Sequence, residues 1–306
     1  MAQLKLDKKL CKRLTREQLA VLKESVRKRR EIPVRVVYTQ EYWDDIAKDS
    51  SYALASRELA ALKKSIPHVA KALAGRKVNV VHMGVGNGIE VPILVKAIKE
   101  RNIGTYSIVD VNRTMLDISE KKVRKQFPSL RVLRFNRDME TYGVREVFAR
   151  TRKAGAKSSL AVLIANGVLF SNDGFVKGIG KSMGKDDFFL LSLELYKPGK
   201  DQEIIDPYLI PTVLDLLANG VRLLGYESRH EYYDGEVDKK DQLLKIYFNP
   251  GGDKSRRLLA LKSYKPTVAQ LNKRMAKLGF RTLLLREFKA IHTCVALYRK
   301  KPEKKY

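Results

Sequence analysis

The feature that most constrains this chain is an apolar run that ends in three alternating glycines. Residues 78–88 read VNVVHMGVGNG, and a second apolar segment, Ile108-Val109, stops at Asp110, 22 residues after Gly88. Because glycine has no Cβ, such a loop can turn sharply and let its backbone N–H groups approach a ligand. An acid at the end of the next parallel strand is placed to accept the ribose hydroxyl protons of a nucleoside. The pattern predicts a site for a nucleoside-containing cofactor.

The spacing of the glycines separates two classes of cofactor. The dinucleotide fingerprint is G-x-G-x-x-G, whereas Gly84, Gly86 and Gly88 form G-x-G-x-G and Ile89 occupies the third dinucleotide position. This loop resembles that of the methyltransferases that use S-adenosyl-L-methionine (SAM), which implies SAM as the cofactor. Those enzymes usually carry an acid two residues before the first glycine, where this chain has His82. The simpler alternative, an ordinary strand-to-helix turn, is disfavoured by the acid that follows the next strand.

The strong positive charge bears on the partners of the chain. It has 61 basic and 34 acidic residues, which gives a net charge of +27 and a pI near 10.0. Such a field favours polyanions, RNA above all. Residues 1–31 hold 11 Lys/Arg against four acids, a net +7, and the other charges are spread along the chain, as on a well-solvated surface. No nucleic-acid recognition motif accompanies the charge, so RNA or another polyanion is a candidate partner only.

Cysteine, histidine and hydrophobic content exclude several other classes. Cys11 and Cys294 lie far apart, which favours free thiols in a reducing compartment and a cytoplasmic location. The four histidines show no metal-ligand spacing, so no metal is expected. No apolar run approaches the roughly 18 residues of a membrane span. The basic N-terminus also lacks the apolar core of a secretory signal.

From Val78 onward, the hydrophobic pattern predicts a parallel α/β sheet of the Rossmann-like kind. Strands are expected at 78–82, 105–110, 131–135, 160–165 and 187–194, and helices at 88–101, 113–126, 140–153 and 173–183. Ligands of such sheets bind at the C-terminal strand ends. At these ends Asp138 is expected either to face the adenine amino group or to be the N-cap of the helix that follows. Asn166, after the fourth strand, is a further cofactor-binding candidate.

The pattern changes after Pro198. Residues 204–225 are expected to be helical, and short strands follow over 228–263, separated by turn signals at Asp234-Gly235 and Asn249–Gly252. A helix over 267–278, ended by Gly279, then precedes an antiparallel hairpin, the usual end of a methyltransferase sheet. We therefore expect a basic helical arm at 1–31, a SAM-binding domain formed by 32–200 plus 267–300, and an inserted, strand-rich substrate or lid region at 201–266.

Several later motifs give a narrower resemblance. Gly167 with Ser171-Asn172, Glu194–Lys197, Leu217–Gly220 and Lys262–Thr267 occur in an order that resembles the histidine-specific SAM-dependent N-methyltransferases of the ergothioneine pathway. Relatives of those enzymes methylate other amino-acid-like amines. The resemblance covers roughly residues 32–300 and is loose at its start, where Ser51-Tyr52 and Arg57-Glu58 stand at the family's Tyr-Pro-Thr-Arg-x-Glu motif.

The resemblance implies roles for four residues on the substrate side. Asn172 matches an asparagine that contacts the substrate amino acid, Tyr38 or Tyr52 matches substrate-side tyrosines, and Ser263 matches a serine near the imidazole. It also implies that the strand-rich insertion supplies the substrate pocket. Each tyrosine has an equally good alternative role as a core or rim aromatic.

One departure from the family narrows the substrate. The family carries Glu two residues before that serine, where this chain has Leu261. Without a hydrogen-bonding carboxylate, buried polar atoms of an imidazole substrate would be unpaired, at a cost of about 1–3 kcal/mol. Leu261 therefore argues against free histidine as the substrate. The same departure is compatible with a family member that has lost catalysis.

The function best predicted by the sequence is methylation of an amine by SAM, the amine being that of a small molecule or of a side chain. SAM carries an activated methyl group, so the protein mainly positions a neutral nucleophile, and uncharged polar residues such as Tyr38, Tyr52 and Asn172 suit that task. Three alternatives stay open at this stage: an RNA- or ribosome-associated methyltransferase, a non-catalytic SAM-binding module, and, more distantly, a nicotinamide-dependent oxidoreductase.

Overall fold

The computed structural model describes residues 6–7, 16–33, 46, 49, 53–73, 75–164 and 167–301. The chain divides into two compact units. Residues 54–196 and 265–306 form one, called the core unit here, and residues 1–53 and 197–264 form the other, called the second unit. Each is described by itself.

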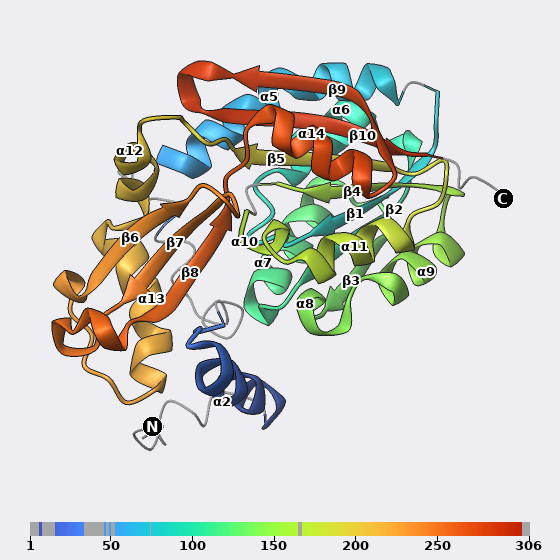
Figure 1. The fold of residues 1–306 in the computed structure, drawn as a ribbon. Coiled ribbons are helices and arrows are strands. Elements are labelled where there is room, and N and C mark those ends of the chain that lie inside the picture. Colours follow the sequence, from blue (N-terminus) through green and yellow to red (C-terminus); the bar gives the residue numbers. More distant parts are fainter. Residues whose placement is uncertain are drawn as a thin grey trace, which may run out of the picture. The chain divides into compact units, whose positions relative to one another are not determined.

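The core unit is built on a sheet of seven strands in the order β3-β2-β1-β4-β5-β10-β9 (Figure 1). Its strands are β1 (Val78–Met83), β2 (Ile103–Asp110), β3 (Val132–Asn136), β4 (Ser158–Leu163), β5 (Phe188–Glu194), β9 (Phe280–Phe288) and β10 (Thr293–Lys300). Strands β1 to β5 pair in parallel, and β10 pairs antiparallel with both β5 and β9. The predicted Rossmann-like sheet with a C-terminal antiparallel hairpin is confirmed. The strand order reverses beside β1, which is where ligands bind in such sheets.

Helices of the core unit connect the strands. They are α5 (Ala53–Ala72), α6 (Val91–Ile98), α7 (Arg113–Gln126), α8 (Met139–Tyr142), α9 (Arg145–Ala154), α10 (Gly167–Phe170), α11 (Asp173–Ser182) and α14 (Val268–Lys277), with short 3-10 turns η1 (Glu100–Asn102) and η6 (Lys289–Ile291). Thr267 caps α14 through a capping box with Gln270, and Gly279, at a φ of +78°, follows its end as predicted.

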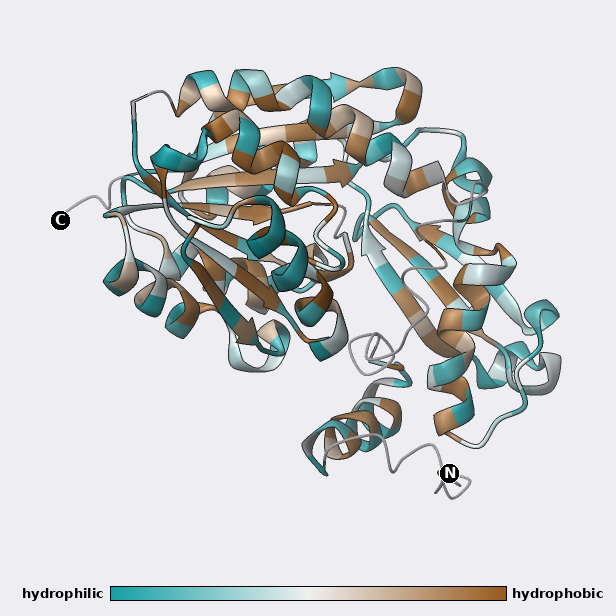
Figure 2. Cartoon of the chain, turned by 180° about the vertical axis from the view of Figure 1, so that it is seen from behind, coloured by the Kyte–Doolittle hydropathy of each residue, from teal (hydrophilic) through white to brown (hydrophobic). Residues whose placement is uncertain are grey.

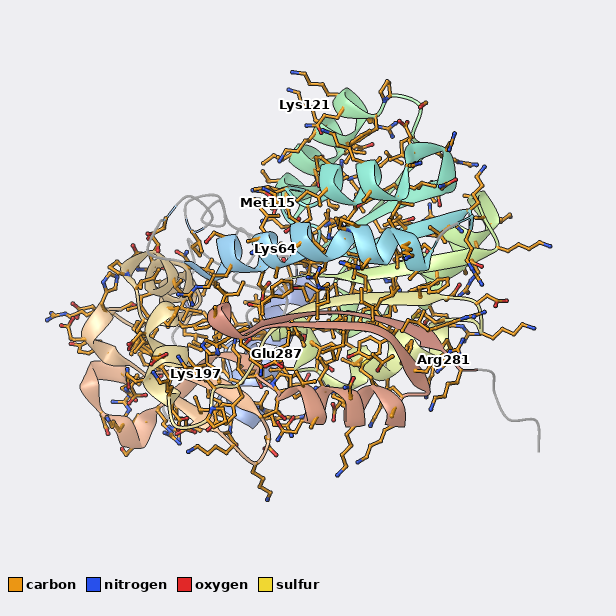
Figure 3. All side chains as sticks on the ribbon, turned by 90° about the horizontal axis from the view of Figure 1, so that it is seen from above. Lys64, Met115, Lys121, Lys197, Arg281 and Glu287 are labelled. Carbon is orange, nitrogen blue, oxygen red and sulfur yellow. The ribbon has the colours of Figure 1, made fainter. Side chains whose placement is uncertain are left out.

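The apolar core follows from strands buried on both faces. Every residue of β1 and of β5 is buried, as expected where crossover helices cover both faces of a parallel sheet. Figure 2 shows the apolar residues concentrated on these strands. One face of β1 packs Val78 and Val80 into a cluster with residues of α5, α6 and α7. In contrast, exposed basic residues such as Lys64, Lys121 and Arg281 lie on different elements of the core unit (Figure 3).

Two helices of the core unit differ from the sequence prediction. The helix expected over 88–101 begins only at Val91, because Gly88 has a φ of +69°, outside the helical region. The helix expected over 140–153 is two helices, α8 and α9, because Gly143 has a φ of +62° between them. Local hydrophobic periodicity continues across both glycines and so did not reveal the breaks.

The second unit contains a three-stranded antiparallel sheet in the order β6-β7-β8. Its described elements are α2 (Arg16–Arg29), α12 (Asp201–Ile205), η2 (Asp206–Tyr208), α13 (Pro211–Leu223), η3 (His230–Tyr232), β6 (Tyr233–Asp238), β7 (Leu243–Phe248), η4 (Pro250–Gly252), η5 (Lys254–Arg256) and β8 (Leu258–Tyr264). The strand-rich insertion is thereby confirmed. The segment after α2 is fixed to β8, because the Ile32 N–H donates to the Leu259 carbonyl at 2.8 Å and the Leu259 N–H to the Arg30 carbonyl at 2.8 Å.

The turn predicted at Asp234-Gly235 is wrong. Both residues lie inside β6, where Gly235 pairs with Ile246 of β7. A Cβ at Gly235 would lie 2.6 Å from the Ile205 side chain, so the glycine serves close packing within the second unit. The Asn249–Gly252 turn is confirmed, with η4 at its centre. In the part of the chain that the structure describes, no single helix has the length and apolar composition of a membrane span, although one helix pair, bent by 67° at its break, meets both criteria together.

Candidate active site

The glycine loop joins β1 to α6 at the C-terminal edge of the core sheet. Gly84, Gly86 and Gly88 all have positive φ, at +65°, +53° and +69°. The N–H groups of Gly84 and Val85 donate to the Val109 carbonyl at 2.8 and 3.2 Å. The loop is thus fixed to the end of β2, and its glycines adopt a backbone conformation that other residues rarely take.

Asp110, the last residue of β2, is held by the backbone on both sides. Its Oδ2 accepts the Gly86 N–H at 2.9 Å, and its Oδ1 accepts the Asn112 N–H at 2.9 Å. Burial raises the pKa of the Asp110 carboxyl, and these N–H groups oppose that rise. Each oxygen of an ionised carboxylate accepts about two hydrogen bonds, so the backbone donors, among which Val111 also contributes, leave part of the acceptor capacity for hydroxyl donors. The loop and the acid that the sequence singled out are therefore directly bonded.

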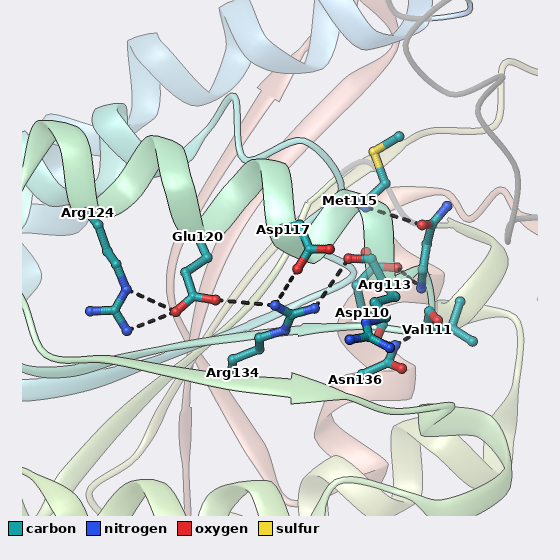
Figure 4. Close-up of polar contacts among 10 residues, drawn as sticks. Asp110, Val111, Arg113, Met115, Asp117, Glu120, Arg124, Arg134 and Asn136 are labelled. Carbon is teal, nitrogen blue, oxygen red and sulfur yellow. Dashed lines mark hydrogen bonds and ion pairs between the residues drawn. The ribbon is translucent and has the colours of Figure 1, made fainter.

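The start of α7 completes the surroundings of Asp110 (Figure 4). Asn112 is the N-cap of α7 and accepts the Met115 N–H at 3.2 Å. On β3, the Asn136 side chain donates to the carbonyls of Asp110 and Val111 at 3.2 and 2.8 Å. These bonds fix the direction of the β2 end, so the Asp110 carboxyl faces the glycine loop instead of rotating with a loose strand terminus.

An ion-pair chain lies further along α7 in the same view. Arg134 on β3 contacts both Asp117 and Glu120, and Arg124 contacts Glu120 at 2.8 Å (Figure 4). Several of these side chains are more than a third exposed, so solvent screening keeps their contribution to stability small. These ion pairs connect α7 to β3 and lie outside the candidate cofactor site.

His82, which replaces the usual acid before the glycines, is a buried neutral residue. Burial lowers its pKa to about 3, and its Nδ1 lies 3.0 Å from the Tyr106 hydroxyl. A neutral imidazole bonded to a phenol carries no charge toward the loop. The role of His82 in this structure is to pair with the Tyr106 hydroxyl inside the core.

An acidic cluster lies at the same edge, with three buried members and half-buried Glu90, and was not found from the sequence. It consists of Glu58 on α5, Glu90 at the N-cap of α6, Glu194 at the end of β5, and Lys265. Glu194 and Lys265 form a buried ion pair. The pKa of Glu58 is raised to about 8, mainly by burial and to a smaller extent by Glu194 and Glu90, against the lowering effect of Lys265. Burial likewise raises the pKa of Glu90 to about 7.

One signal for Glu58 was present in the sequence. Glu58 lies on the apolar stripe of α5, with Leu54 one turn before it and Leu62 one turn after it, all three buried. A charged residue on such a stripe is unusual, because the stripe of an amphipathic helix faces the core. The partners of Glu58 come from distant segments, so the cluster itself could not be read from the pattern.

The other predicted cofactor residues are placed as follows. Asp138 is the N-cap of α8, where its Oδ1 accepts the Glu140 and Thr141 N–H groups at 3.0 and 3.3 Å. The N-cap alternative for Asp138 is thereby confirmed, with α8 as the capped helix. Asn166 lies outside the described residues.

Of the predicted substrate residues, Asn172 and Ser263 are described. Asn172 is the N-cap of α11, accepting the Phe175 N–H at 3.1 Å, and its amide donates to Glu140 at 3.1 Å. Ser263 is buried in β8 of the second unit, two residues from buried Leu261 and therefore on the same strand face. Tyr38 and Tyr52 lie outside the described residues.

Gly88→Ala should destabilise the protein by about 3 kcal/mol. A left-handed φ costs an alanine about 1–2 kcal/mol, and the new Cβ would overlap the buried Ser119 hydroxyl, adding about 1–3 kcal/mol of overpacking. Urea denaturation measures the loss. Gly75→Ala is the matched control, since Gly75 has a φ of +73° and open space around a Cβ. Equal losses of stability at the two positions would show that the clash with Ser119 contributes nothing. Ser119→Gly, combined with Gly88→Ala, should recover the part of the stability that the clash removes.

The free energy of unfolding of the Glu58→Gln variant should increase relative to that of the wild type as the pH rises. Between the ordinary value near 4.5 and about 8, the unfolded chain has an ionised Glu58 while the folded chain keeps its proton. The free energy of unfolding of the wild type therefore falls with pH in this window, by about 2 kcal/mol between pH 6 and 8 relative to the variant. Denaturation at the two pH values tests this. Glu287→Gln, which changes an exposed carboxyl of β9, should show no such trend.

The fold, the loop and the acid together define a nucleoside-cofactor domain of the Rossmann-like methyltransferase class. Residues 14–208 match the model of a family described as histidine-specific, SAM-dependent methyltransferases. This match spans more than half of the 306 residues. The chain belongs to this family and is a SAM-dependent methyltransferase, so the resemblance and the cofactor predicted from the sequence are confirmed.

Solved structures similar to this chain include other methyltransferases. One is the CcbJ methyltransferase from Streptomyces caelestis, 15% identical, covering 87% of this chain and 98% of that one with a TM-score of 0.48. Another, a SAM-dependent methyltransferase from Clostridium acetobutylicum, is 14% identical, covering 79% and 92% with a TM-score of 0.45. A third, an N1-methyltransferase from Burkholderia thailandensis, is 11% identical, covering 94% and 91% with a TM-score of 0.46. No curated protein sequence matches the chain.

Proposed function

We propose that this methyltransferase N-methylates an amine other than free histidine, with the Gly84–Gly88 loop and Asp110 holding SAM. The observation that carries the proposal is the hydrogen bond between the Gly86 N–H and Asp110 Oδ2. It supports a rigid cradle in which backbone and carboxylate face one ligand. When bound, SAM supplies an activated methyl group, and the protein needs to provide position.

The residues present fit such a cofactor in two respects. The positive φ angles of the loop expose backbone where a Cβ would otherwise stand. The Asp110 carboxyl, held by the Gly86 and Asn112 N–H groups, retains acceptor capacity for ribose hydroxyl donors. We assign Asp110 to the ribose and the loop backbone to the amino-acid part of SAM. Asp138, already the N-cap of α8, and Asn166 are proposed as weaker contributors near the adenine.

The proposal that the substrate is not free histidine is supported by two residues of β8 in the second unit. Leu261 and Ser263 share one face of β8, and Leu261 offers no acceptor to an imidazole N–H. A buried imidazole would lose a hydrogen bond there, at about 1–3 kcal/mol. We propose that residues 201–266 supply the substrate pocket, that Ser263 lines it, and that Asn172, Tyr38 and Tyr52 position the amine.

Methyl-labelled SAM tests the proposal directly. The protein is incubated with labelled SAM and, separately, with the small-molecule, protein and RNA fractions of a cell extract, and each labelled product is identified by mass spectrometry. The proposal expects label on a nitrogen in the small-molecule or protein fraction, and none above background with Asp110→Ala. Label confined to RNA, or equal labelling by the Asp110→Ala variant, would contradict it.

A further inference from the structure

The acidic cluster of the core unit carries more negative than positive charge. Glu58, Glu194 and Lys265 are 3%, 5% and 2% exposed, and Glu194 pairs with Lys265. The carboxyls of Glu58 and Glu90 complete the set, so with every group ionised the cluster would hold three negative charges and one positive. Buried charges need a partner of opposite sign, because desolvation without one costs several kcal/mol per ion.

Glu58 has an atom that the described part of the chain leaves without a hydrogen-bond partner. Its Oε2 is buried and unpaired. Buried carboxylate or carboxyl oxygens are normally satisfied, and leaving one unpaired is destabilising. The protein alone limits this cost by keeping a proton on Glu58, whose pKa is raised to about 8. The unpaired oxygen is thus a second observation, independent of the charge count.

The cluster lies where α/β sheets bind ligands. Glu90 follows Gly88 by two residues and is the N-cap of α6, and Glu194 is the last residue of β5. In the sheet order only β4 separates β1 from β5. Because both Glu90 and Glu194 act electrostatically on Glu58, the cluster extends along the C-terminal edge from the glycine loop to β5.

We propose that Glu58 and Glu194 together receive an ammonium group beside the glycine loop. The inference deepens the proposed function and rests on it, since that function places an amine-bearing cofactor and substrate at this edge. An ammonium has three donors and one positive charge, which suits the unpaired Glu58 oxygen and offsets the excess negative charge. Among the described residues, no three Asp, Glu, His or Cys side chains are grouped to hold a metal ion.

Two molecules carry such a group: SAM, in its methionine amine, and the amine acceptor, which would bind as an ammonium and lose a proton to solvent before it can act as a neutral nucleophile. In either case the step balances as a proton exchange. Glu58 loses its proton to solvent as the ammonium arrives, and the carboxylate and ammonium then pair, with no covalent bond made or broken at the cluster. Binding should therefore release a proton near neutral pH.

Neighbouring groups should not obscure that release. Burial raises the pKa of Cys294 to about 12, and burial and Glu90 raise the pKa of Tyr106 well above its usual value, so both stay protonated. His82, bonded to Tyr106, stays neutral because its pKa is lowered to about 3. Lys122 lowers the pKa of Glu90 by its positive charge, and Lys265 lowers that of Glu58 in the same way. Glu58, with a contribution from Glu90, is the group expected to titrate on binding.

Calorimetry in two buffers of different ionisation enthalpy measures the proton released at pH 7. The donor arm compares S-adenosylhomocysteine, which has the methionine-derived ammonium, with 5′-methylthioadenosine, which lacks it. If the cofactor supplies the ammonium, the first should release about one proton and the second about none. The acceptor arm titrates ethylamine into protein saturated with S-adenosylhomocysteine, and release in this arm alone assigns the cluster to the acceptor.

Variants decide whether the cluster is responsible. Glu58→Gln replaces a carboxyl by an amide of similar shape, and it should remove most of the release, leaving at most the contribution of Glu90, while the nucleoside part still binds. Glu287→Gln, at an exposed carboxyl of the core unit labelled in Figure 3, should release protons as the wild type does. The proposal is overturned if neither arm releases a proton, if Glu58→Gln retains the release, or if MgCl2 alone produces it.

The outcomes also separate this inference from the proposed function. If both nucleosides bind and Asp110→Ala weakens them, but no proton release depends on Glu58, only the ammonium site is wrong. If neither nucleoside binds, or if Asp110→Ala binds them as well as the wild type, the proposed function is wrong. The ammonium site, which rests on it, is then wrong as well.

Discussion

Asp110→Ala is expected to weaken SAM binding at least about 100-fold. The carboxylate is proposed to accept both ribose hydroxyls, and hydrogen bonds to a charged group contribute about 1.5–3 kcal/mol each. The substitution also removes the acceptor of the Gly86 and Asn112 N–H groups, so the glycine loop and the residue before α7 are no longer hydrogen-bonded to the same side chain. A loss of about 2.7 kcal/mol corresponds to the 100-fold change. Isothermal titration with SAM measures it.

The control for this prediction is Asp117→Ala, which removes a carboxyl from the exposed side of α7. Its SAM affinity should stay within about twofold of the wild type, since surface ion pairs contribute little. Asp110→Asn should fall between the two, because an amide keeps one acceptor oxygen and loses the charge. An Asp110→Ala variant that binds SAM normally would remove Asp110 from the site.

Lys265→Met is expected to destabilise the protein by about 3–5 kcal/mol. Lys265 is the cationic partner of Glu194 in the buried ion pair, and it also lowers the pKa of Glu58. Removing one partner of a buried pair leaves an uncompensated charge in the interior, which is the costly case. Denaturation by urea at pH 8 measures the loss, which should shrink at pH 5 as the carboxyls take up protons.

A double variant identifies the cause of that loss. Lys265→Met combined with Glu194→Gln removes both charges and should recover more than half of the stability. Arg124→Met, at an ion pair with Glu120 that is largely exposed, should cost less than about 1 kcal/mol. A single Lys265→Met variant as stable as Arg124→Met would show that the buried pair does not stabilise this fold.

The glycine loop and Asp110 could be predicted because both signals are local. A run of buried residues that ends at Gly84 predicts a strand and a sharp turn, and Asp110 marks the end of the next strand by the same rule. The parallel sheet follows from strands too apolar to alternate. Distances such as the 2.9 Å between Gly86 N and Asp110 Oδ2 were not predictable, but the pairing of the two residues was.

The acidic cluster could not be predicted, because it joins segments far apart in the sequence. Glu194 and Lys265 are 71 residues apart, and although both lie in segments that resemble the family, nothing in the sequence pairs them. Glu58 stands at a family motif and on the apolar stripe of α5, but neither signal names its partners. The same limit explains the error at Gly235, whose packing against Ile205 replaces a turn that the local Asp-Gly signal favours.

The substrate side was the least predictable part for a physical reason. Substrate specificity depends on a few polar atoms. At position 261 this chain has leucine where the family has glutamate, so a hydrogen-bond acceptor is missing, and Leu261 is part of the paired strand β8. Neither the fold nor family membership identifies the methyl acceptor, which is left to experiment.

A crystal structure of the protein with S-adenosylhomocysteine tests the central claim most directly. The account predicts the ribose within hydrogen-bond distance of both Asp110 carboxylate oxygens, with the Gly84–Gly88 backbone against the amino-acid part of the ligand. A nucleoside bound elsewhere, or an Asp110 side chain turned away from its ribose, would contradict it.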